Sequence, residues 1–325
     1  MPLNKVKISV CIPCFNSERT LRNALVSVFN QSFSDWEIIL VNDGSRSKDK
    51  KGYKCQKILK KTAKEYKIPR QKIRYLEHST NLGLLEARRT AINASNGDYI
   101  VILDSDDQLL PDALKILYEK ALQEEADIVC CSEILIDTEG NEIKRTNPVS
   151  NTEFTLSGKE ILDGFIVNHT HKGFLWGKII KKSLYQKALN QIPFTRCTMA
   201  EDFLQYFFIS YYAEKLVLID TPVYAYYLGA GISSGTKIET LEKWEQICTA
   251  ANVFTTIFGV IQEENLALTE EEIEALRLQS RSYLKNTLDQ LEKKVAPELR
   301  ESAKALLCDY WGEDFVRLME NAVEV

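Results

Sequence analysis

The chain has 325 residues, 45% of them hydrophobic and 27% charged, which is the composition of a globular protein with a large core. Its formal net charge of −5, without any block of Lys or Arg, argues against nucleic acid as the main partner. No apolar run approaches the roughly 20 residues that span a bilayer, and no signal segment is visible. We therefore expect a cytoplasmic protein, at most peripheral to the inner face of the membrane.

The first 135 residues alternate apolar runs with amphipathic segments. This alternation, with short links, is typical of a doubly wound, mainly parallel sheet of the α/β class. The periodicity predicts strands at 7–13, 36–41, 73–77, 99–103 and 127–134, and helices at 18–30, 53–66, 81–94 and from Pro111 onward.

The second half of the sequence is less regular. We expect a hairpin turn at 137–141, a helix from Ser157, an extended segment at 174–180 and strands at 216–219 and 223–227. From about residue 239 the pattern is helical to the end, with breaks near 263–269 and at Pro297. The chain is therefore divided into an α/β domain, residues 1–235, and a C-terminal helical region, residues 236–325.

The eight cysteines do not form the pattern of a disulfide framework. Cys11 and Cys14 have the spacing of half a zinc or redox site, but no second pair follows at zinc spacing. We expect buried free thiols in a reducing compartment.

Three carboxylates follow the predicted strand at 99–103, namely Asp104, Asp106 and Asp107. An isolated Asp-x-Asp is more often a solvated turn, because short motifs match by accident. Here Asp43 also follows a strand, and the carboxyl ends of parallel strands share the edge where open α/β sheets bind ligands. Converging carboxylates repel each other, and a hard divalent cation relieves that repulsion. The pattern predicts a crevice for a nucleotide or sugar phosphate.

Six motifs, in this order, resemble the inverting nucleotide-sugar glycosyltransferases of family 2. They are residues 8–16, 41–45, Asn81 with Gly83, Ala87-Arg88, 96–107 and Glu201-Asp202. The resemblance implies a GT-A fold, a nucleotide diphosphate sugar donor with UDP as the favoured nucleotide, and an Mn²⁺ or Mg²⁺ cofactor. It makes residues 1–135 the nucleotide-sugar-binding half and residues 136–235 the acceptor-side half, and it does not cover the tail after about residue 240.

The resemblance also implies roles for single residues. Asp43 matches the carboxylate that binds uracil, Asp106 matches the metal ligand with Asp104 beside it, and Asp202 matches the catalytic base. Phe15 stands where Tyr is more frequent, and Asn42 stands where many members have Asp. The nucleotide-sugar-binding residues implied in this way are Pro13, Phe15, Asn16, Asp43, Arg88, Asp104 and Ser105.

The acceptor side is less defined by the sequence. Trp176 has an aromatic face that suits a sugar ring, although a core Trp is nearly as frequent, and Lys178 beside it could contact a phosphate. Glu201 is an acceptor-side residue and the alternative to Asp202 as base. Whether His169 or His171 adds a metal ligand is left open. The acceptor would be a glycan or lipid-linked hydroxyl, as in cell-surface polysaccharide synthesis.

Two other functions remain open at this point: a nucleotidyltransferase on a similar sheet, and a nucleotide-sugar-binding protein without turnover. For the tail we expect helices that pack on the catalytic domain or form a homodimer contact. The cationic residues of the tail allow a weaker alternative, contact with an anionic membrane surface that holds the acceptor.

Overall fold

The computed structural model describes residues 6–146, 153–229 and 237–323. Its α/β part contains a ten-stranded sheet in the order β3-β2-β1-β4-β9-β6-β10-β5, with β7 paired to β6 and β8 to β10. The strands are β1 (Ile8–Cys14), β2 (Trp36–Asp43), β3 (Ile73–His78), β4 (Tyr99–Ile102), β5 (Gln108–Leu109), β6 (Ile128–Ile136), β7 (Glu142–Thr146), β8 (Phe154–Ser157), β9 (Lys178–Lys181) and β10 (Lys215–Tyr227).

The strands at the N-terminal end of the sheet are parallel. β1 pairs with β2 and β4, and β2 pairs with β3, all in the same direction. β6 and β10 are also parallel to each other, whereas β9 lies between β4 and β6 and is antiparallel to both. The predicted mainly parallel α/β sheet is therefore confirmed.

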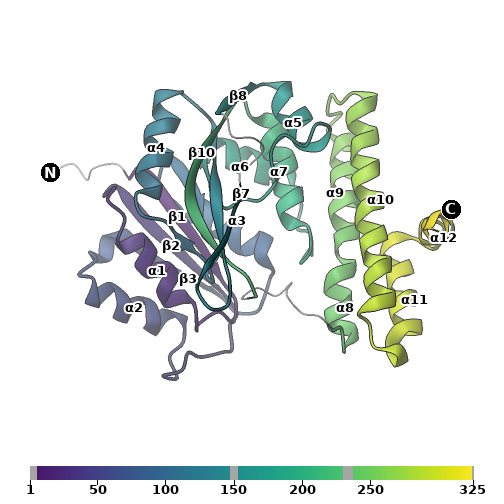
Figure 1. Cartoon of the computed structure of the whole chain (residues 1–325), viewed down its shortest axis with the longest axis horizontal. Helices are drawn as coiled ribbons and strands as arrows, with labels where there is room; N and C mark the ends of the chain where they lie inside the picture. Colours follow the sequence, from purple (N-terminus) through teal and green to yellow (C-terminus); the bar gives the residue numbers. More distant parts are fainter. Residues whose placement is uncertain (1–5, 147–152, 230–236, 324–325) are drawn as a thin grey trace.

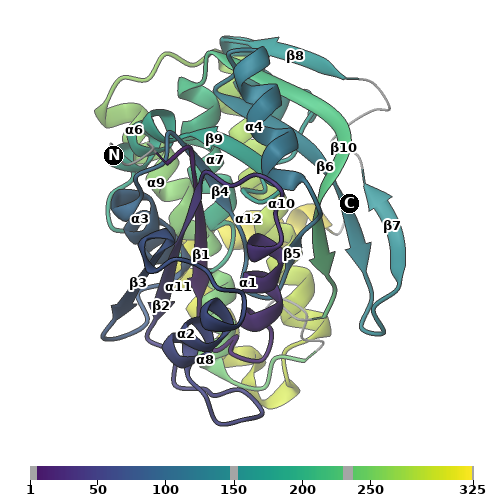
Figure 2. The same cartoon turned by 90° about the vertical axis from the view of Figure 1, so that its left-hand side faces the viewer.

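Helices cover both faces of this sheet, which explains why β1, β2 and β4 are buried along their whole length (Figures 1 and 2). Successive residues of a strand point to opposite faces: Val10 belongs to the core on one face of the sheet, whereas Cys11 belongs to the core on the other. The helices of the α/β part are α1 (Leu21–Phe29), α2 (Cys55–Glu65), α3 (Leu84–Ala94), α4 (Ala113–Gln123), α5 (Lys159–Ile166), α6 (Lys182–Gln191) and α7 (Glu201–Tyr212), with a 3₁₀ turn at Arg70–Lys72.

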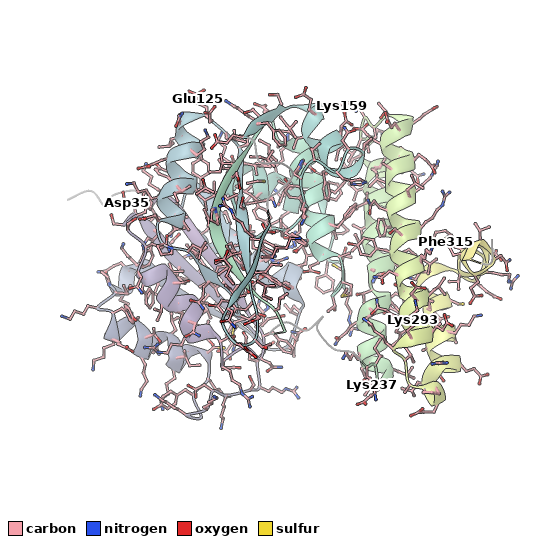
Figure 3. All side chains as sticks on the ribbon, in the orientation of Figure 1. Asp35, Glu125, Lys159, Lys237, Lys293 and Phe315 are labelled. Atoms are coloured by element: carbon pink, nitrogen blue, oxygen red, sulfur yellow. The ribbon has the colours of Figure 1, made fainter. Side chains whose placement is uncertain are left out.

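The C-terminal region is helical, as predicted. It consists of α8 (Leu241–Cys248), α9 (Ala250–Glu263), α10 (Glu270–Lys293), a 3₁₀ turn at Pro297–Leu299, α11 (Arg300–Trp311) and α12 (Glu313–Val323). Phe254 and Ile257 of α9 join the same core as Phe203 of α7, so these helices pack on the α/β part. Lys159 at the start of α5 also binds Glu272 of α10 at 2.8 Å (Figure 3). In the described ranges, no helix is long and apolar enough to cross a membrane.

Three details differ from the sequence-based expectations. In the predicted extended segment 174–180, only the last residues form a strand, β9 (Lys178–Lys181), and this strand is antiparallel to its neighbours β4 and β6. The two strands expected at 216–219 and 223–227 are one strand, β10, with an irregular register around Pro222. The division at residue 135 falls inside β6, so the two halves share one sheet, and the boundary at residue 235 lies outside the described residues.

All eight cysteines are free thiols, and seven of them are buried. Cys14 does not pair with Cys11. Its sulfur lies 3.0 Å from that of Cys55, beneath the loop that follows β1.

Candidate functional site

The carboxyl ends of β1, β2 and β4 meet at one edge of the sheet, which we call the strand-end edge (residues 15–17, 43–45 and 104–107). Ser17 after β1 and Ser105 after β4 are joined by a hydrogen bond of 2.5 Å between their hydroxyls. The parallel register brings these loops together, as the sequence predicted.

Asn16 ties the loop after β1 to the loop after β2. Its φ of 54° places it in the left-handed region, which Asn tolerates better than most residues. Its side-chain oxygen accepts hydrogen bonds from the backbone N–H groups of Arg46 and Ser47, at 3.0 and 3.1 Å. Phe15 beside it is 38% exposed, so one aromatic face is open to a ligand, whereas Pro13 is buried at the end of β1.

Asp43 is 2% exposed, and both of its carboxylate oxygens are occupied within the protein. One oxygen accepts hydrogen bonds from His78 Nδ1 at 2.7 Å and from the N–H of Leu82 at 2.9 Å. The other accepts from the Asn81 amide and the N–H of Gly83, both at 2.9 Å. Asp43 therefore holds the 81–83 turn, and a base could reach it only by sharing an oxygen.

The acidic turn after β4 divides its three carboxylates by environment. Asp107 is buried and accepts hydrogen bonds from the Tyr224 hydroxyl and the Tyr227 N–H, both at 2.8 Å, and burial raises its pKa to about 8. The side chain of Asp106 accepts no hydrogen bond from another described residue, and burial raises its pKa. Asp107 is thus a structural acid, while Asp106 is available to a ligand.

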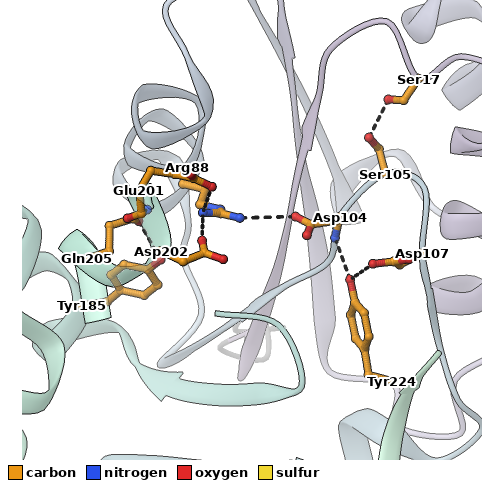
Figure 4. Close-up of polar contacts among 10 residues, drawn as sticks. All are labelled: Ser17, Arg88, Asp104, Ser105, Asp107, Tyr185, Glu201, Asp202, Gln205 and Tyr224. Atoms are coloured by element: carbon orange, nitrogen blue, oxygen red, sulfur yellow. Dashed lines mark hydrogen bonds and ion pairs between the residues drawn. The ribbon is translucent and has the colours of Figure 1, made fainter. Parts of the chain in front are cut away.

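Arg88 of α3 lies at the centre of a group of acids that we call the carboxylate cluster (Figure 4). Its side chain is 1% exposed, and its guanidinium contacts Asp104 Oδ1 and Glu201 Oε1, each at 3.5 Å. It also forms an ion pair with Asp202 Oδ1. Burial alone would lower the pKa of Arg88, but the three carboxylates raise it above its ordinary value. The sequence predicts that Arg88 contacts the nucleotide. In the structure its side chain is buried, so Arg88 does not present its guanidinium to a nucleotide at the surface.

The cluster contains three acidic side chains and only one cationic side chain. This excess of acids affects how readily each of them is protonated. Burial, followed by the charge of Asp202, raises the pKa of Glu201 to about 8. Burial also raises the pKa of Asp104 to about 6, although Arg88 opposes the shift. The raised pKa favours the protonated form of Glu201, which cannot act as a base.

Helix α7 positions Glu201 and Asp202 in its first turn, where the helix dipole favours negative charge. Ala200, which precedes the helix, has a φ of 62° and turns the chain sharply into it. The side chain of Asp202 is 24% exposed. Its Oδ1 is held by Arg88, whereas its Oδ2 accepts no hydrogen bond from any described residue. Asp202 thus offers one oxygen that no described residue binds.

The predicted metal site rests on Asp106 and Asp104. No group of three His, Cys, Asp or Glu side chains in the described part of the chain could hold a metal ion by itself. Two carboxylates nevertheless fit a hard cation that takes its other ligands from phosphate oxygens and water, as Mg²⁺ usually does. His171 is an unsuitable third ligand, because it is buried and the nearby Lys178 ammonium repels a cation.

Trp176 is buried, at 8% exposure, rather than open to an acceptor. It stacks between Phe174, at 4.6 Å between ring centroids, and Tyr224, at 5.0 Å. Lys178 is also buried, with its ammonium on the backbone oxygen of Phe174 and 5.0 Å above the Tyr206 ring. The exposed ring of this aromatic column is Phe174, at 40%.

Two residues of the site escaped the sequence-based prediction. The hydroxyl of Tyr224 bonds both Asp107 and the N–H of Asp104, but nothing distinguishes this residue within its aromatic strand. His78 could have been predicted, because it ends strand β3, which pairs with β2, and it stands directly opposite Asp43.

Comparison with known proteins identifies the family of this chain. The family model "Glycosyl transferase family 2" matches residues 9–204. Glycosyltransferase GlyA of Streptococcus pneumoniae is 29% identical over 82% of this chain and 37% of its own length. The cholesterol galactosyltransferase of Borreliella burgdorferi is 32% identical over 57% of this chain and 51% of its own. The chain thus spans about a third to a half of these two relatives.

A solved structure has the same fold. The crystal structure of residues 1–349 of S. aureus TarS in complex with UDP-GlcNAc matches with a TM-score of 0.58 at 17% identity, over 98% of this chain and 91% of that one. This likeness confirms the GT-A fold, and it includes the C-terminal helices that the sequence motifs did not cover. The chain belongs to glycosyl transferase family 2.

Proposed function

We propose that this protein is a metal-dependent inverting glycosyltransferase that uses a UDP-sugar. The observation that carries the proposal is the carboxylate cluster, in which Arg88 joins Asp104 of the donor-side turn to Asp202 of α7. Residues from the two halves of the domain are thereby fixed around one point, as a reaction between a donor and an acceptor requires.

The donor would lie along the strand-end edge. The open face of Phe15 suits stacking of the uracil ring, and the Asn16 and Asp43 loops are fixed in advance by internal hydrogen bonds. Structural neighbours support the nucleotide, since the S. aureus TarS structures include complexes with UDP and UDP-GlcNAc. Asp43 would act mainly by fixing the turn at residues 81–83, and this turn would lie against the nucleotide.

Asp106, with Asp104, would hold the divalent cation. When bound, such a cation neutralises charge on the departing diphosphate. The free carboxylate of Asp106 fits this role because no described residue competes for its oxygens.

Asp202 would accept the proton of the incoming hydroxyl through its free Oδ2, while Arg88 holds Oδ1 and fixes the orientation of the carboxylate. The hydroxyl oxygen then bonds to the anomeric carbon from the face opposite the diphosphate, and the bond to the diphosphate oxygen breaks. Attack from that face inverts the anomeric centre. Glu201 is the weaker candidate for the base because its raised pKa favours the protonated form.

The test uses a panel of nucleotide sugars with Mn²⁺, with Mg²⁺ and with a chelator, and measures release of the nucleoside diphosphate. UDP binding is measured in parallel by calorimetry. We expect hydrolysis of one or a few UDP-sugars and tighter UDP binding with metal. Absence of both would contradict the proposal, and pyrophosphate release from a nucleoside triphosphate would indicate a nucleotidyltransferase instead.

A further inference from the structure

A small pocket lies on the acceptor side of the sheet, between β6, the start of β9 and the segment before β9. Its lining includes His171, Lys178, Glu133 and Phe174. Its cavity volume of about 20 Å³ accommodates a single water-sized group. The pocket can therefore enclose one oxygen-sized group of a ligand but not a sugar ring.

Two polar side chains of this pocket are more than nine-tenths buried. Lys178 is 6% exposed, and its ammonium contacts the backbone oxygen of Phe174 and the face of the Tyr206 ring, without an ion pair to a described carboxylate. His171 is 3% exposed, and its Nε2 is buried without a hydrogen-bond partner among the described residues. A buried ammonium without a carboxylate and a buried unpaired ring nitrogen are both costly, and a ligand that satisfies both would recover that cost.

The charges around the pocket favour an anion. The buried Lys178 and the exposed Lys172 contribute two positive charges and the buried Glu133 one negative charge, while burial keeps His171 neutral by lowering its pKa to about 3. The neutral ring can present Nε2–H to the pocket when the Thr170 hydroxyl turns its hydrogen to Nδ1, 3.4 Å away, in place of the Gly164 oxygen at 3.2 Å. An anionic oxygen between Lys178 and His171 would then receive two hydrogen bonds.

The pocket is connected to both parts of the proposed active site. Lys178 lies over Tyr206 of α7, the helix that begins with Glu201 and Asp202. At its mouth, Phe174 is exposed and stacks on Trp176, which in turn stacks on Tyr224. A flat aromatic face beside an anion-binding pocket is an arrangement that fits a sugar ring carrying a charged substituent.

We propose that this pocket binds an anionic oxygen, from a phosphate or a carboxylate, on an acceptor sugar whose ring lies against Phe174. The role of this ligand as an acceptor rests on the proposed function, but its binding can be measured without turnover. It makes the acceptor an acidic or phosphorylated glycan rather than a neutral one.

The experiment measures binding of three sugars to the full chain in the presence of UDP and Mn²⁺, by calorimetry. Methyl glucoside is the neutral ligand, methyl glucuronide carries a carboxylate and glucose 6-phosphate carries a phosphate. We expect at least one anionic sugar to bind roughly 10- to 100-fold more tightly than the neutral one, as expected for charge-assisted hydrogen bonds. Equal affinities, or no binding of either anionic sugar at millimolar concentration, would overturn the proposal.

Variants show whether the pocket is responsible. Lys178→Met should remove the preference for the anion, and His171→Phe should weaken it severalfold. Lys187→Met is the matched control, because Lys187 lies over Tyr212 on another part of the surface. Circular dichroism verifies folding of each variant. Preference retained in a folded Lys178→Met variant contradicts the proposal.

UDP titration of the same variant separates this inference from the proposed function. We expect Lys178→Met to bind UDP as the wild type does. A large loss of UDP affinity would assign the pocket to the donor diphosphate and overturn the acceptor assignment, whereas wild-type protein that fails to bind UDP would contradict the proposed function itself.

Discussion

The loop of Asp43 and the carboxylate cluster hold their charges in opposite ways. The carboxylate of Asp43 is matched by four hydrogen-bond donors and is closed to solvent. In the cluster, one guanidinium contacts three carboxyl groups, and one oxygen of Asp202 has no hydrogen-bond partner among the described residues. Internal hydrogen bonds therefore fix the shape of the Asp43 loop, whereas the cluster keeps a carboxylate oxygen available for chemistry.

The largest effect on stability is expected at the centre of the cluster. Arg88→Met removes the only cation facing Asp104, Glu201 and Asp202 in the described structure, and uncompensated buried charge costs about 3–5 kcal/mol. Urea denaturation of the variant and wild type measures the difference in the free energy of unfolding. Arg317→Met, at an exposed ion pair with Glu313, is the control and should change stability by less than about 1 kcal/mol. A loss at Arg88 as small as the control's would refute the central role of Arg88.

A smaller effect is expected at the edge. Asp43→Asn turns an amide N–H₂ toward backbone donors that a carboxylate accepts, which should cost about 1–3 kcal/mol. UDP affinity should fall with it, because the 81–83 turn loosens. The matched control is Asp137→Asn in the β6–β7 turn, where a surface Asp accepts three similar hydrogen bonds. Equal losses of UDP affinity in both variants would argue against a nucleotide at the edge.

Stability should also depend on pH through the cluster. Burial, followed by the charge of Asp202, raises the pKa of Glu201 to about 8, against about 4.3 in the unfolded chain. Between pH 4.3 and 8 the folded state binds more protons than the unfolded state. The contribution of Glu201 to the free energy of unfolding is therefore fully present below about pH 4.3 and is lost as pH rises toward 8. We expect the free energy of unfolding to fall between pH 5 and 8, by on the order of 1–3 kcal/mol.

The variant Glu201→Gln tests the source of that slope. Gln keeps an oxygen for Arg88 but cannot titrate, so the slope between pH 5 and 8 should become shallower. The remaining slope comes from Asp107, because burial also raises its pKa to about 8. Glu313→Gln is the exposed control and should keep the wild-type slope. An unchanged slope in Glu201→Gln would assign the pH dependence to other groups.

The edge could be predicted from the sequence because each of its loops follows a strand. Asp43, Asp104 and Asp106 stand directly after apolar runs, and the parallel register places all such ends together. Family motifs then identified the fold. The internal use of both Asp43 oxygens could not be predicted, since two of the donors are backbone N–H groups of a turn whose shape the sequence leaves open.

The cluster was less predictable. The sequence identified Arg88, Asp104 and Asp202 as separate site residues but did not predict that they contact one another, because that contact depends on the packing of α3 against α7 on the same face of the sheet. Trp176 was predicted at the acceptor side and is instead enclosed between Phe174 and Tyr224. Phe174 and Trp176 are two residues apart in an apolar stretch, and neither period nor composition indicates which ring reaches the surface.

The most direct test of the account compares wild type with Asp202→Asn in two measurements on the same preparation. Turnover of the UDP-sugar should fall by about 10²- to 10⁴-fold, because the variant cannot accept the hydroxyl proton. UDP affinity in the presence of Mn²⁺ should stay close to the wild-type value, because the proposed function assigns Asp202 to the acceptor hydroxyl and not to the nucleotide. Turnover close to that of the wild type in the folded variant would contradict the assignment of Asp202 as the base.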